Sequence, residues 1–97
     1  MPTHIMLATY TDQGIRNVKE SPKRADAARE LAESCGVEMK DLFLTMGGYD
    51  LVVLLDAEDD VSMATFALKL GSLGNVRTTT LKAFGERDYR TIIESLP

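Results

Sequence analysis

Hydrophobic and polar positions divide the chain into alternating strand-like and helix-like stretches. Residues 4–10 and 75–84 are dense in apolar and β-branched side chains, which favours strands. Residues 21–35 and 58–70 repeat apolar side chains every three or four positions, which predicts helices that bury one face. Two further apolar runs flank a Gly-Gly pair at 47–48 and are typical of strands. The predicted order of elements is therefore β-α-β-β-α-β.

The glycine pair joins the two middle strands into a hairpin. Residues 37–45 enter the corner, with a bulge or irregularity expected at residues 40–41, and residues 49–56 return the chain. The two strands are therefore expected to be antiparallel neighbours. The returning strand has no polar side chain at residues 51–55, so both of its faces require cover.

Capping residues set the expected ends of the helices. Thr11-Asp12 and Ser21-Pro22 each suit a helix start, so the first crossover should consist of two helical pieces with a bend. The second piece should end at Gly36, which suits a left-handed C-cap. Acidic residues precede the second crossover helix and favour its N-terminus.

Two βαβ halves with right-handed crossovers form an α+β, ferredoxin-like βαββαβ fold. Its helices cover one face of a four-stranded antiparallel sheet and leave the other face open. A last short helix, with apolar side chains at Tyr89, Ile92, Ile93 and Leu96, is too short to be stable alone in water, so it must dock on something. Because an uncovered apolar face is unfavourable, we expect two copies to pack sheet to sheet as a dimeric α+β barrel.

Composition narrows the class of protein. A chain of 97 residues fits one domain spanning residues 1–97, and the net charge of −4 argues against a nucleic-acid partner. The apolar run at 51–55 is far shorter than the roughly 20 residues that a membrane span needs, so we expect a soluble protein with no membrane partner. A single cysteine, Cys35, and the lack of a secretory pattern favour the cytoplasm.

His4, the only histidine, is a candidate proton acceptor at the start of the first strand. The alternative, which we favour, is a histidine at the surface. No other residues stand at metal-ligand spacing from it and no motif of a cofactor site is present, so we expect neither a bound metal nor a cofactor. Cys35 lies in the apolar stripe of a helix and is expected to be a buried, neutral thiol.

Tyr10, Tyr49 and Asp50 are candidate ligand-binding residues. Tyr49 and Asp50 follow the glycine corner and, in a strand, would point to opposite faces, so that one could enter a pocket. If Tyr10, Tyr49 and His4 converged, they could bind or polarise a phenolic or carbonyl ligand. The structural alternative has Asp50 stabilising the turn and the tyrosines packing with their hydroxyls at the rim.

Two basic features could attract an anion. Arg16 and Arg24 belong to a cluster of positive charge, although pairing of both with Glu20 along a solvated helix is the alternative. Residues 71–77 form a glycine-rich loop whose main-chain N–H groups and Arg77 could hold an anion. Such a loop is more often only the exit of a helix.

Four blocks resemble the GYD domain family, named for its Gly-Tyr-Asp motif: TDQGI at 11–15, SPKR at 21–24, LTMGGYD at 44–50 and GSLGNVRT at 71–78. The likeness covers almost the whole chain. It implies a dimeric α+β barrel of ferredoxin-like halves and assigns no activity. Barrels of similar fold include ligand-sensing domains, cofactor-free monooxygenases and lactone isomerases, which is an analogy of fold alone.

We therefore expect a homo-oligomeric protein that binds a small molecule in a pocket of the barrel. The pocket would lie between the sheet and its helices, rimmed by Tyr10, Tyr49, Asp50 and either Arg77 or Arg16. The alternative function is a cofactor-independent isomerase or monooxygenase-like enzyme acting on a small aromatic or lactone substrate, with His4 or a tyrosine as acid or base. A third is an assembly subunit without a pocket.

Overall fold

The computed structural model describes residues 1–97 and contains the expected elements in the expected order. Their bounds are β1 (Thr3–Tyr10), α1 (Asp12–Arg16), the 3₁₀ turn η1 (Val18–Glu20), α2 (Ser21–Ser34), β2 (Val37–Leu44), β3 (Leu51–Ala57), α3 (Asp60–Ser72), β4 (Val76–Ala83) and α4 (Glu86–Glu94). The four strands form one sheet in the order β2-β3-β1-β4, with every neighbouring pair antiparallel. The predicted ferredoxin-like α+β fold is confirmed.

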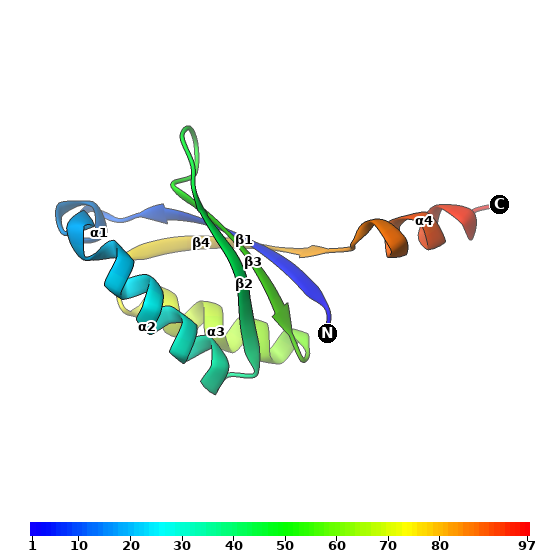
Figure 1. The fold of residues 1–97 in the computed structure, drawn as a ribbon, viewed down its shortest axis with the longest axis horizontal. Helices are drawn as coiled ribbons and strands as arrows, with labels where there is room; N and C mark the ends of the chain where they lie inside the picture. Colours follow the sequence, from blue (N-terminus) through cyan, green and yellow to red (C-terminus); the bar gives the residue numbers. More distant parts are fainter.

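The crossover helices α2 and α3 lie on the same side of the sheet (Figure 1). On the helix-covered face of the central strand β1, His4, Met6 and Ala8 are buried. The intervening residues Ile5 and Leu7 point to the opposite, open face and are only half-buried. The period-two alternation of β1 therefore separates a covered side from an uncovered one, although both sides are apolar.

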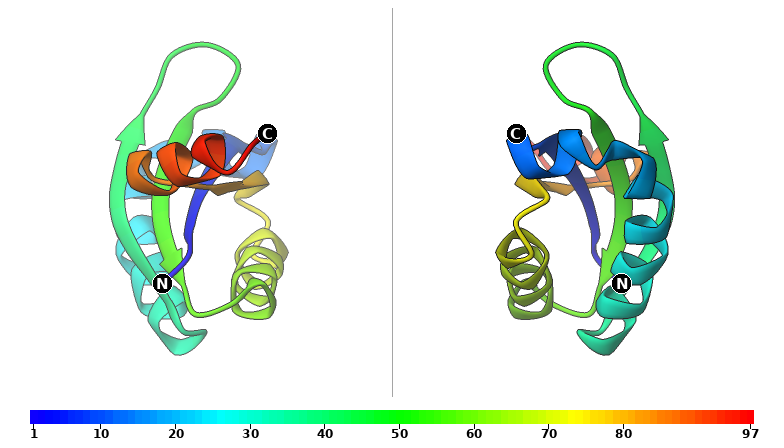
Figure 2. Two further views of the ribbon diagram at one scale, coloured as in Figure 1. Left: turned by 90° about the vertical axis from the view of Figure 1, so that its right-hand side faces the viewer. Right: turned by 90° about the vertical axis from the view of Figure 1, so that its left-hand side faces the viewer.

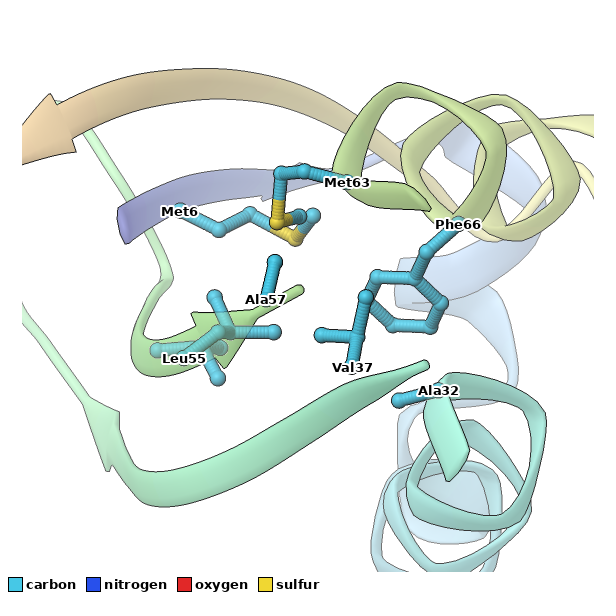
Figure 3. Close-up of a cluster of buried hydrophobic side chains, with 8 residues drawn as sticks. Met6, Ala32, Val37, Leu55, Ala57, Met63 and Phe66 are labelled. Carbon is cyan, nitrogen blue, oxygen red and sulfur yellow. The ribbon is translucent and has the colours of Figure 1, made fainter. Parts of the chain in front are cut away.

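The core occupies the helix-covered face, where α3 contacts β4, β3 and β2. Met63 and Phe66 of α3 are buried there, and Figure 3 shows Met63 against Met6 and the ring of Phe66 beside Val37. Two apolar residues of this helix, Val61 and Leu68, are exposed. α3 therefore buries only part of its apolar side chains, and the buried ones are the large residues Met63 and Phe66.

Local backbone signals fall where the sequence placed them. The first crossover consists of two helices, as predicted: α1 ends at Arg16, and the η1 turn joins it to α2. Gly36 has a φ of 79°, a left-handed conformation that glycine adopts without strain, and it ends α2. The register of β2 against β3 shifts between Met39 and Asp41, which confirms the predicted bulge.

The β2–β3 hairpin differs from the prediction at its return. Residues 45–50 form a loop, which we call the hairpin tip, and β3 begins only at Leu51, so the prediction that Tyr49 and Asp50 lie in the strand was wrong. The main-chain N–H of Thr45 donates to the carbonyl oxygen of Asp50 at 2.8 Å and closes this loop. Figure 1 shows that the hairpin tip projects beyond the sheet.

Asp50, at the base of the hairpin tip, joins β3 to the end of β1. One carboxylate oxygen of Asp50 accepts a 2.8 Å hydrogen bond from the main-chain N–H of Tyr10, and the N–H of Asp50 donates to the carbonyl oxygen of Ala8 at 2.9 Å. The last regular pair of the two strands is Ala8 with Leu51. Asp50 thus continues the β1–β3 pairing past the end of the ladder and holds the position of Tyr10.

The C-terminal helix α4 packs on no other part of this chain. None of its residues is buried, and its apolar residues Tyr89, Ile92 and Ile93 are exposed. In Figure 1 α4 extends away from the sheet and the other helices. The docking that the sequence predicted for this helix therefore needs a surface outside the chain. No helix of the protein combines the length and the apolar character needed to cross a bilayer.

Removal of the N-cap of α3 should lower stability in a pH-dependent way. Hydrogen bonds from the main chain and side chain of Ser62 hold the pKa of Asp59 below its ordinary value of 3.8. A depressed pKa contributes stability that is present above 3.8 and is lost as the pH falls through the lower, folded-state value. We expect Asp59→Ala to lower the melting temperature by a few degrees near neutral pH, with a smaller difference at about pH 2.5. Circular dichroism melts measure both values, and Glu30→Ala, on the exposed side of α2, is the control; an equal difference at both pH values would contradict the assignment.

Loss of the Asp50 carboxylate should destabilise the end of the central strand. Asp50→Ala leaves the N–H of Tyr10 without its acceptor, so the free energy of unfolding should fall by about 1–2 kcal/mol. Asp50→Asn keeps an acceptor oxygen and should lose less. Urea unfolding measures the change. Tyr49→Phe is the matched control, because the Tyr49 hydroxyl makes no hydrogen bond, and a loss as large as that of Asp50→Ala would refute the role given to Asp50.

Candidate functional site

A groove lies between the helix-covered face of the sheet and the two crossover helices. Seen end-on, α2 and α3 stand apart beneath the sheet (Figure 2). The space has a volume of about 490 Å³ and is lined by 20 residues, of which 16 are hydrophobic. We call it the inter-helix groove. Its volume is within the range of small-molecule sites, which is roughly 300–1,000 Å³.

The sequence of α2 explains why this end of the sheet is not filled. The first half of α2 turns Ala25 and Ala28 toward the groove, and these side chains are too short to reach the strands. Across the groove, Leu70 and Leu73 belong to the C-terminal part of α3 and its cap. Large side chains thus fill the core end of the helix-covered face, while alanines leave the other end open.

Polar groups gather where β1 ends and α2 begins. The hydroxyl of Tyr10 and the hydroxyl of Ser21 lie 2.8 Å apart and form a hydrogen bond. Arg24 and Asn75 also line this part of the groove. The inter-helix groove is therefore apolar along its length and polar at one end.

Arg24 is held by main-chain carbonyls and not by an acid. Its Nη1 donates to the carbonyl oxygen of Asn17 at 2.9 Å, and its Nη2 donates to that of Gly14 at 3.1 Å. The expected pairing of Glu20 with Arg16 and Arg24 was wrong, since the carboxylate of Glu20 lies 3.8 Å from Nζ of Lys23 instead. For Arg16 the reason is the η1 turn, which interrupts the helix and removes the spacing that an i, i+4 pair requires, and Arg24 instead donates to the two carbonyls.

The buried histidine lies away from the inter-helix groove. His4 is 4% exposed, so the expectation of a surface histidine was wrong: β1 is a central strand, and His4 lies on its helix-covered face. Nε2 of His4 is 3.6 Å from a carboxylate oxygen of Asp60, which also accepts from Nζ of Lys82 at 3.2 Å. Nδ1 of His4 is buried without a hydrogen-bond partner.

The candidate acid–base residues do not converge. His4 and Tyr10 share one face of β1 but are six residues apart, which is about 20 Å along a strand. His4 borders a separate and smaller cavity of about 240 Å³. Tyr49 is in the hairpin tip, outside the residues that line either cavity, and its side chain is 41% exposed. The structure therefore brings together neither the two tyrosines nor either of them with His4.

The remaining candidates also lie outside the inter-helix groove. Arg16 is exposed at the end of α1, and Arg77 is exposed on β4, where it pairs with Thr9 of the open face. The glycine-rich loop before β4 offers carbonyl oxygens to the first crossover, since Thr11 Oγ1 donates to Gly74 and Gln13 Nε2 donates to Leu73. This loop is thus engaged in packing and is not arranged as an anion-binding nest.

Sequence reasoning missed most of the groove and found one of its residues. Tyr10 is the one predicted rim residue that lines it. Asp50 lies outside the groove and accepts a hydrogen bond from the main-chain N–H of Tyr10. Ser21, Arg24 and Asn75 were not assigned to a pocket. The usable signal was the pair Ala25 and Ala28, small residues on the face of a helix that should cover a sheet. His, Cys, Asp and Glu side chains form no group of three or more that could hold a metal ion.

Comparisons with known proteins identify the family. The model of the GYD domain matches residues 4–93. A relative from Thermus thermophilus, named glutamine synthetase and cystathionine beta-lyase binding protein, is 37% identical over 89 residues, which cover 91% of this chain and 94% of the relative.

Solved structures share the fold. The crystal structure of TTHA0845, also from Thermus thermophilus, aligns with a TM-score of 0.57 and 26% identity, covering 87% of this chain and 94% of that one. The crystal structure of FFRP-DM1 aligns with a TM-score of 0.60 over 87% of this chain and 100% of that one, and its 21% identity supports the fold alone. Since the family model spans almost the whole sequence, the chain belongs to the GYD domain family.

Proposed function

We propose that this protein is a homo-oligomeric binding protein that docks on partner enzymes. The observation that supports this most directly is the relative whose name describes binding to glutamine synthetase and cystathionine beta-lyase. The relative is 37% identical across nearly the full length of both chains, which supports testing the same kind of partner here. Glutamine synthetase and cystathionine beta-lyase are therefore the partners to test first. The free thiol of Cys35 fits a reducing cytoplasm, which we propose as the compartment.

The hairpin tip is the surface that we assign to the enzyme partner. Met46 is 100% exposed in the hairpin tip, which projects beyond the sheet (Figure 1), and Tyr49 of the same loop follows it after two glycines. Methionine and tyrosine are enriched in the buried centres of protein interfaces because they offer large contact areas. A projecting loop with two such side chains can insert into a recess of a larger protein.

The open face of the sheet is the surface that we assign to a second copy of the chain. Ile5, Leu7 and Leu54 lie on it and are half-buried, while Leu81 and Phe43 at its edges are exposed. Sheet-to-sheet packing of two copies would remove these side chains from water, at about 25 cal/mol for each Å² of apolar surface. The exposed apolar side of α4 provides further area for the same association.

A second candidate function is the binding of a small molecule in the inter-helix groove. The supporting observation is the groove itself, whose volume of about 490 Å³ and largely hydrophobic lining resemble those of small-molecule sites. The two functions are compatible, because the groove and the hairpin tip are different surfaces. Catalysis by His4 with a tyrosine gains no support from the geometry, since Tyr10 lies at the opposite end of β1 and Tyr49 lies in the hairpin tip.

Substitution in the hairpin tip should weaken binding to a partner enzyme. We expect the wild-type protein to bind purified glutamine synthetase or cystathionine beta-lyase of its own organism, measured by biolayer interferometry. Met46→Asp places a charge at the centre of the assigned surface and should weaken binding at least about tenfold. Val61→Asp, a matched change at an exposed apolar residue of α3, should leave binding unchanged. If neither enzyme binds the wild-type chain, the proposal of an enzyme-binding protein is wrong.

A charge on the open face should dissociate the homo-oligomer. The mass of one chain is 10.7 kDa, and we expect light scattering of the wild-type protein to give a multiple of this value. Leu54→Lys introduces an ammonium group into the proposed sheet-to-sheet interface, where its desolvation is unfavourable, and should yield a monomer. The control is Leu68→Lys on the exposed side of α3, which should keep the wild-type mass. A wild-type protein that is monomeric at micromolar concentration would refute the assignment.

A further inference from the structure

The polar end of the inter-helix groove carries one charge and no acid. Among the 20 lining residues Arg24 is the only charged side chain, and neither an aspartate nor a glutamate lines the space. No carboxylate lies within ion-pairing distance of the Arg24 guanidinium. In a protein with a net charge of −4, this end of the groove is therefore locally positive and uncompensated.

We infer that the inter-helix groove binds an apolar molecule bearing a single carboxylate, and that Arg24 holds the carboxylate. This inference rests on the small-molecule function proposed for the groove and names the class of ligand. The hydrophobic lining takes the apolar body of the ligand, and the arginine end takes its anionic head.

The polar end of the inter-helix groove has hydrogen-bond donors without a partner, which could bind an anionic head group. A guanidinium has five N–H groups, and Arg24 spends one on the carbonyl oxygen of Asn17 and one on that of Gly14, which leaves three. The two carbonyl contacts also fix the plane of the guanidinium. Tyr10 and Ser21 have one hydroxyl hydrogen each, and their mutual bond uses one of the two, so one donor remains. The site thus offers donors to a ligand that is rich in acceptors.

The charge balance selects a monoanion. One guanidinium can pair with a carboxylate through two parallel hydrogen bonds, a geometry that adds both affinity and orientation. A phosphate dianion would bring a second negative charge into the groove, where no second cation lines the wall. A cationic ligand would be repelled by Arg24. A neutral ligand would fill the apolar space and leave the arginine without a counter-charge.

The matching experiment uses three ligands that differ only in the head group. Isothermal titration calorimetry of the full-length protein with octanoate, 1-octanol and octylamine, each below its micellar concentration, compares an anionic, a neutral and a cationic head on one apolar chain. We expect octanoate to bind at least about tenfold more tightly than 1-octanol, because charge-assisted hydrogen bonds contribute more than neutral ones. Octylamine should bind most weakly.

Substitutions separate the head-group contact from the groove. Arg24→Met keeps an apolar stem without the charge and should weaken octanoate roughly tenfold to a hundredfold while leaving 1-octanol unchanged. Arg16→Met makes the same change of charge at an exposed residue outside the groove and should bind as the wild type does. Ala25→Phe fills the groove and should weaken both ligands. If Arg24→Met does not fold, Arg24→Lys keeps the charge without the planar fork and should weaken octanoate severalfold.

The outcomes distinguish failure of the carboxylate inference from failure of the small-molecule function proposed for the groove. Equal affinities for octanoate and 1-octanol, or an Arg24 variant with unchanged octanoate binding, would overturn the carboxylate inference while groove binding stands. Absence of binding by all three compounds, or binding that Ala25→Phe does not affect, would overturn the small-molecule function and the inference with it. Octanoate binding that Arg24→Met abolishes and Arg16→Met preserves would support both.

Discussion

The central strands β1 and β3 carry apolar side chains on both faces, and the chain has helices for only one. This imbalance determines the rest of the structure. On the helix-covered face, His4, Met6, Val53 and Leu55 are buried. On the open face, the alternate residues of the same strands remain half-buried, because nothing in the chain lies over them. A strand cannot hide both sets of side chains with one layer of helices, so the open face has no cover within the chain, and this is the reason for assigning it to a second copy.

The helix-covered face is itself divided by the size of the side chains above it. Where α3 crosses the strands, Phe66 and Met63 fill the space and make the core (Figure 3). Where α2 begins, Ala25 and Ala28 leave the inter-helix groove. Packing density in a core depends on matching volumes, so small residues over a broad sheet produce a cavity and not a tighter contact. The groove is thus a consequence of the α2 sequence, and its charge comes from Arg24 at the same end of that helix.

The aspartate of the Gly-Tyr-Asp motif has a role that connects the hairpin to the groove. Asp50 does not line the groove, yet its carboxylate holds the N–H of Tyr10, whose hydroxyl meets Ser21 at the polar end. The hairpin tip beyond Asp50 is free to carry the exposed Met46. One short segment therefore separates two surfaces, the groove on the inside of the fold and the projecting loop on its outside, which agrees with two compatible binding functions.

The sequence by itself determined the elements of this fold, because their signals are local. The glycine corner at 47–48, the bulge near residue 40 and the glycine at position 36 each depend on a few neighbouring residues and lie where they were expected, although β3 begins two residues later than predicted. The family resemblance had the same source, since its four blocks are short stretches of sequence.

Only the tertiary structure decided which side chains meet. His4 is buried because β1 became a central strand, and Arg24 found carbonyls of the broken first crossover in place of Glu20. Two residues predicted at the rim of the pocket lie elsewhere. Tyr49 is in the projecting hairpin tip, and Arg77 is on the open face of the sheet. These outcomes depend on strand order, on the point at which a helix breaks and on contacts between residues far apart in the chain. No local pattern encodes such contacts, whereas local patterns do encode the helices and strands that make them possible.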